Sequence, residues 1–392
     1  MKNKYQDIQN TKANLDDSGF DWRTRVFSHP ERTIRLGTSF SGIGAIEHAF
    51  KRLGLNAEIL FAGDIDDNCK TAYFANYNIT EDKWHTDIHK FDAKPYKGLV
   101  DLFVGGAPCQ AFSLRGKQRG FEDTRGTLFR EFARVVIECQ PKVFIFENVR
   151  GMLYHDKGNT WDVIKNTFEK DCGYQIYYQV LNSRDYGVPQ GRDRIYCIGF
   201  KNETDFKYPV PIPLNKTMYE LLDDTVDDKY FLKEKGFHFI TQSINHTKSY
   251  TQINGNIQLC QKRNQQFNWH GDFIFHPFTE ENNQPSEFIE KVHLVANAEE
   301  SYYTKTNIEE RTLYPDGKGN HVMRRNQSVK CDASKGWFRK LTPRECFRLM
   351  GFDDSFKIVV SDTEAYKQAG NSIVVDVLMA ILKQLDITKY GI

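Results

Sequence analysis

The chain has 392 residues, 40% of them hydrophobic, which is enough for one large domain and a smaller one. Lys and Arg number 53 against 52 Asp and Glu, so binding to a polyanion would need a local concentration of positive charge. The short apolar runs and the polar N-terminus indicate neither a membrane span nor a signal peptide, and predict a cytoplasmic protein. The eight cysteines form no CxxC pair, which argues against a zinc site and against a secreted disulfide scaffold.

The first 32 residues are polar and unpatterned, and a regular alternation follows them. Near-continuous apolar strands take turns with amphipathic helices up to Phe200, which is typical of a parallel sheet covered on both faces. We therefore predict an α/β fold with a doubly wound, mostly parallel, Rossmann-like sheet. The predicted strands are 33–40, 57–64, 99–106, 142–149, 174–182 and 194–200, and the predicted helices are 44–54, 66–77, 127–140 and 160–173.

The alternation stops in the region 205–335, which is rich in Asn, Gln, His and aromatic residues and predicts a smaller, irregular, β-containing domain. It resumes at 336–392 with a helix that has Thr342 as its cap and Pro343 at its first position, followed by an apolar helix over 372–385. We predict an arm at 1–32, a large domain formed by 33–204 plus 336–392, and an inserted domain at 205–335.

The stretch SFSGIGAIEHAF connects the first predicted strand to the first predicted helix. Gly42 and Gly44 would let a ligand approach the backbone near the N-terminus of the helix, and Asp64 ends the next strand, where an acid binds ribose hydroxyls. Glu47 stands where a dinucleotide fingerprint has its third glycine, which favours a nucleoside without phosphates. An ordinary tight turn is the alternative, because a glycine-rich turn alone is a weak signal. Asp87 would end a third strand, although taken alone it suggests a cap or a surface acid.

Cys109 follows the apolar stretch LVDLFVGG and precedes a glycine-rich run with several cations. Functional crevices of open α/β sheets lie at the carboxyl ends of strands, and nearby cations lower the pKa of a thiol. An arbitrary cysteine is more often a small buried hydrophobe. The strand-end position, the preceding proline and the loop favour a nucleophile here.

Three charged residues belong to apolar stretches. Glu147 ends the strand KVFIFENV, and burial there should raise its pKa and make it a proton donor near neutral pH. Arg192 and Arg194 stand two apart before a strand, so alternation points both to one face, where they suit a carbonyl, a carboxylate or a phosphate. Caps, ion pairs or surface salt bridges are the alternative interpretations.

Together these stretches resemble the DNA (cytosine-5)-methyltransferases of bacterial restriction–modification systems. GGAPCQAFS is similar to the PCQ motif of that family, FENV to its ENV motif, QGRDR to its QxRxR motif, and KQAGNSIVVDVL to its C-terminal GNSV-type helix. RKLTPRECFRLMGF matches the segment that follows the target-recognition domain of the family. The motifs occur in the family's order and span roughly residues 34–200 and 336–385.

The resemblance implies a methyl transfer from S-adenosylmethionine to carbon 5 of a flipped-out cytosine in a specific double-stranded DNA sequence. The 33–204 plus 336–392 unit would be catalytic and the 205–335 unit would recognise the target. Cys109 would form a covalent adduct with carbon 6, Glu147 would act at nitrogen 3, Arg194 at oxygen 2, and Arg192 would brace them. The implied cofactor residues are Phe40, Gly42, Ile43, Gly44, Asp64, Ile65, Asp87, Pro108, Asn371 and Ser372.

The sequence departs from the family pattern at two positions of the first turn. The family often has an acid where Thr38 stands and a third glycine where Ala45 stands. Asp64 replaces a glutamate and Ile65 a common tryptophan. No residue is assigned to a metal. The predicted DNA contacts are Gln110, Ser113, Arg115, Lys117, Arg119 and Arg125, in and before a loop that would close over the DNA. The stretches QKRNQQFNWH and HVMRRNQS are candidates for reading bases, and solvated loops are the alternative.

We expect a monomer that acts on double-stranded DNA in the bacterial cytoplasm without contact with a membrane. A cognate restriction endonuclease would act on the same site without direct contact. A tRNA cytosine-5 methyltransferase of the same fold is the nearest alternative, although the long inserted region favours DNA. A non-catalytic DNA-binding module is disfavoured by the complete set of catalytic residues, and a nicotinamide-dependent oxidoreductase by the missing third glycine.

Overall fold

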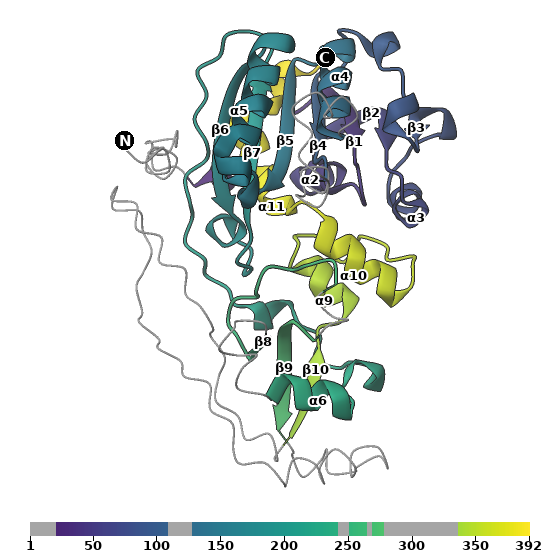
Figure 1. Ribbon diagram of the computed structural model, residues 1–392, viewed down its shortest axis with the longest axis vertical. Helices are drawn as coiled ribbons and strands as arrows, with labels where there is room; N and C mark the ends of the chain where they lie inside the picture. The colour runs from purple at the N-terminus through teal and green to yellow at the C-terminus, as the bar shows by residue number, and fades with distance from the viewer. Residues whose placement is uncertain (1–20, 109–127, 242–250, 265–268, 278–335) are drawn as a thin grey trace.

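The computed structural model describes residues 21–108, 128–241, 251–264, 269–277 and 336–392. They form a seven-stranded sheet of order β3-β2-β1-β4-β5-β7-β6 and a three-stranded sheet of order β10-β9-β8 (Figure 1). In the large sheet the neighbouring strands β3, β2, β1, β4 and β5 are all parallel. Strand β7 runs antiparallel to both of its neighbours, β5 and β6. The mostly parallel α/β fold is therefore confirmed. The large-sheet strands are β1 (Thr33–Ser39), β2 (Asn56–Gly63), β3 (Trp84–His85), β4 (Leu102–Gly105), β5 (Val143–Val149), β6 (Gln175–Asn182) and β7 (Asp193–Phe200).

Two hydrophobic cores lie on opposite faces of the large sheet, which explains why its strands are almost continuously apolar. In β5, Val143 and Ile145 pack in one core, while Phe144 and Phe146 pack in the other. Helices α4 and α5 cover the face with the phenylalanines, and α2 and α11 cover the other (Figure 1). The bounds of these helices are Ala45–Leu53 for α2, Leu128–Cys139 for α4, Asn159–Asn166 for α5 and Val375–Leu385 for α11. A π-helical turn, Thr167–Asp171, continues α5, and α3 (Asp67–Asn76) follows β2.

Helix α11 returns from the far end of the chain to the α/β unit, as predicted, and completes the core beside α2. All its residues except Lys383 and Gln384 are buried. Arg52 at the end of α2 donates to Asp376 of α11 at 2.6 Å. The sheet thus depends on the last residues of the chain for one of its covering layers. No helix in the described part of the chain is long and apolar enough to cross a bilayer.

A smaller unit lies below the carboxyl edge of the large sheet (Figure 1). Its sheet is formed by β8 (Thr251–Ile253), β9 (Gly271–Pro277) and β10 (Gly336–Lys340), and α6 (Glu234–Thr241) packs on it through Phe237 and Ile240. Helices α9 (Pro343–Arg348) and α10 (Asp362–Asn371) then lead back to α11. The predicted cap of α9 is confirmed, since Thr342 accepts from the backbone N–H of Glu345. The limits 205 and 335 of the inserted domain stay predictions.

Candidate active site

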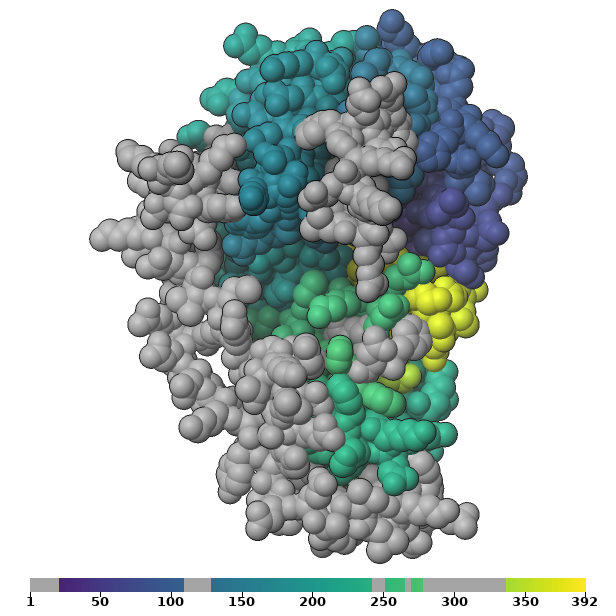
Figure 2. All heavy atoms as spheres, in the orientation of Figure 1, coloured from purple at the N-terminus to yellow at the C-terminus, as the bar shows by residue number. Residues whose placement is uncertain are grey.

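The residues predicted to form the site follow strands whose carboxyl ends share one edge of the sheet. Phe40 follows β1, Asp64 follows β2 and Pro108 lies just beyond β4. Glu147 lies near the end of β5. Strands β1 and β4 are neighbours in the sheet. The strand order runs from β1 to β2 and β3 on one side, and from β4 to β5, β7 and β6 on the other, so it reverses between them. Open α/β sheets bind their ligands at such a switch point. This edge faces the small unit, and Figure 2 shows residues of that unit (green) against those of the large sheet (teal).

The turn between β1 and α2 needs its glycines for two different reasons. Gly42 has φ +55°, and among the described residues no atom outside the adjoining chain lies within 4 Å of the position where a Cβ would point, so its backbone faces open space there. Gly44 has φ +78° and caps α2, and a Cβ there would come within 2.2 Å of the Tyr77 ring. Phe40 also has a positive φ, 54°. Ile43, by contrast, is 1% exposed and packs in the core.

Asp64 closes this turn from the neighbouring strand. Its carboxylate oxygens accept from the backbone N–H groups of Gly42 at 2.9 Å and Asp66 at 3.0 Å. Burial raises the pKa of Asp64, although these backbone hydrogen bonds oppose the shift. The carboxylate keeps lone-pair capacity for a hydroxyl group. Ile65 beside it is 79% exposed, an unusual state for isoleucine that leaves an apolar surface for a flat ring. These groups fit the adenosine part of S-adenosylmethionine.

Glu47 does not face this open space. It is 5% exposed and accepts hydrogen bonds from the hydroxyls of Tyr73, at 2.5 Å, and Thr38, at 3.2 Å. Burial raises the pKa of Glu47 to about 7, even though both hydroxyls favour its charged form. The sequence did not identify Tyr73 as the partner, because the pairing joins α2 to α3 across the turn.

Glu147 and Arg194 form an ion pair at this edge. Arg194 Nε lies 3.2 Å from Glu147 Oε1, and the glutamate is 9% exposed. Burial raises the pKa of Glu147, although the charges of Arg194 and Arg192 lower it in part. Gly106, on the chain that leaves β4, lies so close that a Cβ there would be 3.0 Å from Glu147 Oε2. Asn148 Nδ2 donates to Ala107 O at 2.8 Å and fastens the same chain to β5.

Arg192 serves a different purpose from Arg194, although the two stand two residues apart. It is 3% exposed and donates to three backbone carbonyls, those of Gln261 at 2.6 Å, Ser372 at 2.8 Å and Gly370 at 3.1 Å. Burial lowers the pKa of Arg192, and the charge of Arg194 adds to this. The geometry makes Arg192 a brace between the large sheet, the small unit and the end of α10.

The other predicted cofactor residues lie at the ends of other elements. Asp87 caps a short 3-10 helix by accepting from His89 N at 3.0 Å and lies 3.9 Å from Lys90 Nζ. Pro108 and Asn371 are exposed, whereas Ser372 is 8% exposed and ends α10. The predicted nucleophile and DNA contacts, Cys109, Gln110, Ser113, Arg115, Lys117, Arg119 and Arg125, lie outside the described residues, as do the whole of the candidate stretch HVMRRNQS and the middle of QKRNQQFNWH.

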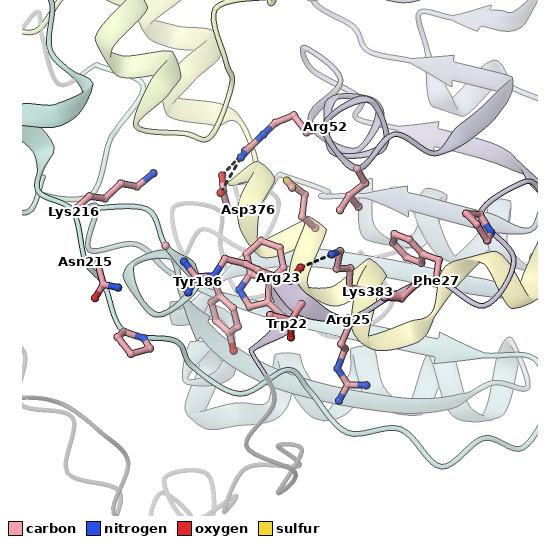
Figure 3. Close-up of a pocket in the computed structure, with 17 residues that line it drawn as sticks. Trp22, Arg23, Arg25, Phe27, Arg52, Tyr186, Asn215, Lys216, Asp376 and Lys383 are labelled. Carbon is pink, nitrogen blue, oxygen red and sulfur yellow. Dashed lines mark hydrogen bonds and ion pairs between the residues drawn. The ribbon is translucent and has the colours of Figure 1, made fainter.

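A cavity of about 720 Å³ opens along α11 and contains none of the predicted site residues (Figure 3). Residues 22–27 and Pro30 line one side of it, and Tyr186 and Lys216 line another. Lys383 Nζ donates to Arg23 O at 2.7 Å there, so that the cavity marks where the N-terminal segment is attached to α11.

Comparisons with known proteins identify the family of this chain. A sequence model of the family described as C-5 cytosine-specific DNA methylase matches residues 35–386. The type II methyltransferase M1.ScrFI of Lactococcus lactis subsp. cremoris is 35% identical over 351 residues, which cover 88% of this chain and 76% of the relative. The type II methyltransferase M.HhaI of Haemophilus parahaemolyticus is 34% identical over 352 residues, covering 89% of this chain and 93% of the relative.

Solved structures resemble the chain in fold. The crystal structure of a DNMT2 variant from Spodoptera frugiperda has a TM-score of 0.62 at 20% sequence identity and covers 90% of this chain and 99% of its own. At that identity the likeness concerns the fold alone.

Proposed function

Because the chain belongs to the family of C-5 cytosine-specific DNA methylases, it is a DNA cytosine-5 methyltransferase that uses S-adenosylmethionine, and we propose that Cys109, Glu147 and Arg194 carry out its reaction. The substrate is a cytosine in a specific sequence of double-stranded DNA. The base leaves the helix, since its carbon 6 cannot be attacked while the base is stacked. The observation that carries the proposal is the buried 3.2 Å pair of Glu147 and Arg194.

Cys109 acts as the nucleophile. Its thiolate adds to carbon 6 of the ring, and the displaced electron pair makes carbon 5 nucleophilic enough to take a methyl group. S-adenosylmethionine supplies that methyl group. The proton on carbon 5 is then lost to a base, and the returning electron pair expels the thiolate of Cys109. This divides one difficult step into easier ones.

Glu147 and Arg194 stabilise the charge that develops on the ring. Glu147 in its protonated form donates a hydrogen bond to nitrogen 3, and its raised pKa favours this form. The Arg194 guanidinium, beside it, meets oxygen 2. Arg192 holds both in place through the three carbonyls it binds.

The cofactor contacts follow the open strand edge. Asp64 binds the ribose hydroxyls, Ile65 packs on the adenine, and the backbone at Gly42 allows close approach. The space beside Gly42 and the exposure of Ile65 support these assignments. Phe40, Asp87, Pro108, Asn371 and Ser372 complete the proposed pocket.

Covalent trapping tests the proposal. On DNA containing 5-fluorocytosine the proton on carbon 5 is replaced by fluorine, so the thiolate cannot be expelled after methyl transfer. The wild type should therefore form an adduct with this DNA that survives denaturation, and Cys109→Ser should form none. A wild type without an adduct would contradict the mechanism and favour a non-catalytic DNA-binding module. Methyl transfer to tRNA but not to duplex DNA would favour the RNA-modifying alternative.

We also propose that the enzyme works as a monomer in the bacterial cytoplasm and protects host DNA from a restriction endonuclease of the same specificity. The names of its type II relatives support this role. Sequencing the 5-methylcytosines of a plasmid propagated with the enzyme should identify one recognition sequence. The same plasmid should resist the restriction activity of the host, and cleavage despite full methylation would contradict protection.

A further inference from the structure

Ser41 lies in the middle of the β1–α2 turn, where it is bonded through its backbone and its side chain. Its N–H donates to Gly63 O at 2.9 Å, its Oγ accepts from Gly63 N at 2.9 Å, and its carbonyl accepts from Gly44 N at 2.9 Å. Gly63 is the last residue of β2 and directly precedes Asp64. Ser41 therefore fixes the distance between the glycine turn and the acid that is proposed to bind the ribose.

A chain of hydroxyl groups leads from Ser41 into the core. Ser41 Oγ lies 2.7 Å from Thr38 Oγ1, and Thr38 Oγ1 donates to Glu47 Oε1 at 3.2 Å. A hydroxyl group has a single proton to donate. Because Thr38 gives its proton to the carboxylate, Ser41 donates to Thr38 and accepts from Gly63. The chain thus has a fixed direction, from the end of β2 to Glu47.

Glu47 is the acceptor at the inner end of this chain, and its surroundings balance its charge only in part. Oε1 accepts from Tyr73 at 2.5 Å and from Thr38, whereas Oε2 is buried and has no hydrogen-bond partner among the described residues. The phenols of Tyr73 and Tyr77 face it from α3, and burial raises the pKa of both far enough to keep them neutral. On β1 it meets the uncharged Thr38. Since burial raises the pKa of Glu47 itself to about 7, its charge changes near neutral pH.

From these contacts we propose that Glu47 is a positioning residue for the cofactor: in its charged form it orients the hydroxyls of Thr38 and Ser41 and so holds the turn that binds S-adenosylmethionine. A charged carboxylate accepts stronger hydrogen bonds than a neutral carboxyl group, so the chain is held most firmly when Glu47 is ionised. In the sequence, Thr38 is a departure from the family pattern and Glu47 only an argument against phosphates. This inference rests on the cofactor contacts proposed above for Gly42 and Asp64.

The affinity for the cofactor should then depend on pH. Between about pH 6 and pH 8 Glu47 loses its proton and the turn becomes fixed, so the Kd for S-adenosylmethionine should fall about five-fold. By reciprocity, binding should lower the pKa of Glu47 and release protons. Calorimetric titration across this range, in buffers of different ionisation enthalpy, measures both the Kd and the protons released.

Two variants separate the charge from the chain of hydroxyls. Glu47→Gln keeps the size of the side chain but has no charge, so its Kd should stay at the weaker, acid-side value at every pH. Thr38→Val keeps the shape of threonine but interrupts the chain. It should lose the dependence on pH and about five-fold in affinity at the alkaline end of the range.

Thr388→Val is the matched control. Thr388 is fully buried, much as Thr38 is, and its hydroxyl also joins a backbone N–H to a carboxylate: it accepts from His29 N at 3.1 Å and donates to Asp386 at 2.7 Å. It belongs to the turn Ile387–Tyr390, which contacts β1 near the start of this strand, at the opposite end from the cofactor turn. This variant should bind the cofactor as the wild type does.

The proposal would be overturned if Glu47→Gln kept the dependence on pH, or if Thr388→Val lost as much affinity as Thr38→Val. It would also be overturned by a dependence that is seen with S-adenosylmethionine and absent with S-adenosylhomocysteine. S-adenosylhomocysteine would bind the same turn without the sulfonium charge, so that result would mean a direct attraction to the sulfonium instead of a fixed turn. Thermal melting shows that each variant is folded at the temperature of the titration.

The pKa of Glu47, followed by NMR in protein with labelled glutamate, separates this inference from the proposed function. It should fall when S-adenosylhomocysteine binds the enzyme in the absence of DNA. A wild type that shows this fall but methylates no DNA would refute the proposed function alone. A Glu47 pKa that stays the same on binding would overturn the role of Glu47 and leave the proposed reaction intact.

Discussion

Glu147 shows how much a single residue depends on its surroundings. A carboxyl group at the end of an apolar strand is costly to ionise, because burial removes its water. Arg194 at 3.2 Å compensates only in part, so the pKa of Glu147 stays above its ordinary value. The residue can therefore be both a proton donor and the neighbour of a cation.

The rate should follow the protonated fraction of Glu147. As pH rises through its raised pKa the carboxyl loses its proton, and kcat should fall along this limb. Glu147→Gln keeps a donor but cannot transfer a proton, so kcat should drop by about 10² to 10⁴ and lose this limb. A kcat–pH profile of both enzymes checks this, and a limb that persists in Glu147→Gln would assign it to another group.

Glu47 should make stability depend on pH in the opposite sense from an ordinary paired carboxylate. Its pKa rises from 4.5 to about 7 on folding, so the folded state binds more protons than the unfolded state between these values. The free energy of unfolding should decrease by up to about 3 kcal/mol as pH rises from 4.5 to 7, and this contribution should then level off.

Denaturant titrations of the wild type and Glu47→Gln between pH 5 and pH 8 measure this effect. The glutamine is neutral throughout, so the difference in stability between the two proteins should change over the acidic part of this range. A constant difference would show that Glu47 keeps its proton affinity on folding.

At the scale of an element, the β1–α2 turn requires glycine for reasons that the sequence shows only in part. Gly44 needs both a positive φ and the absence of a Cβ, because of the Tyr77 ring, whereas Gly54 at the other end of α2 needs only its φ of +68°. Gly54→Ala should cost about 1 kcal/mol of unfolding free energy. Gly44→Ala should cost more, since the ring must also move.

Only Gly44→Ala should weaken binding of S-adenosylmethionine, because a displaced ring shifts the turn that lines the proposed pocket. Calorimetric titration with the cofactor and thermal melting of both variants provide the two measurements. Equal losses of affinity in both variants would show that the β1–α2 turn has no specific part in binding the cofactor.

The succession of strands and helices was predictable because strands that are buried on both faces, such as β5, are almost continuously apolar in sequence. The positions of Glu147 and Asp64 at strand ends followed from the same pattern. The family resemblance gave Arg192 and Arg194 different roles, but the residue pattern alone could not show their partners, Gln261 and Glu147, which lie in other elements. Nor could it show that Glu47 turns toward Tyr73, or that β7 runs antiparallel to both of its neighbours.

For the molecule as a whole, a net charge of +1 means that DNA binding has to depend on a few local cations. We predict that replacing Arg115, Lys117, Arg119 and Arg125 by alanine weakens DNA binding and reduces the slope of log K against log salt. Each lost phosphate contact should reduce that slope by about 0.9.

A matched variant in which Lys94, Lys97 and Lys201 are replaced removes exposed cations from the opposite edge of the sheet and should keep the wild-type slope. Fluorescence anisotropy with duplex DNA at several salt concentrations gives the slopes. An unchanged slope in the fourfold variant would place the DNA contacts elsewhere.

The return of α11 to the side of α2 also governs when this protein can fold. The ribosome makes α2 among the first elements and α11 among the last, and the ion pair of Arg52 and Asp376 joins them. Until α11 emerges, the apolar face that it covers stays exposed on a nascent chain, where it can bind a chaperone or associate wrongly. Methylation competence therefore begins only after α11 has been synthesised.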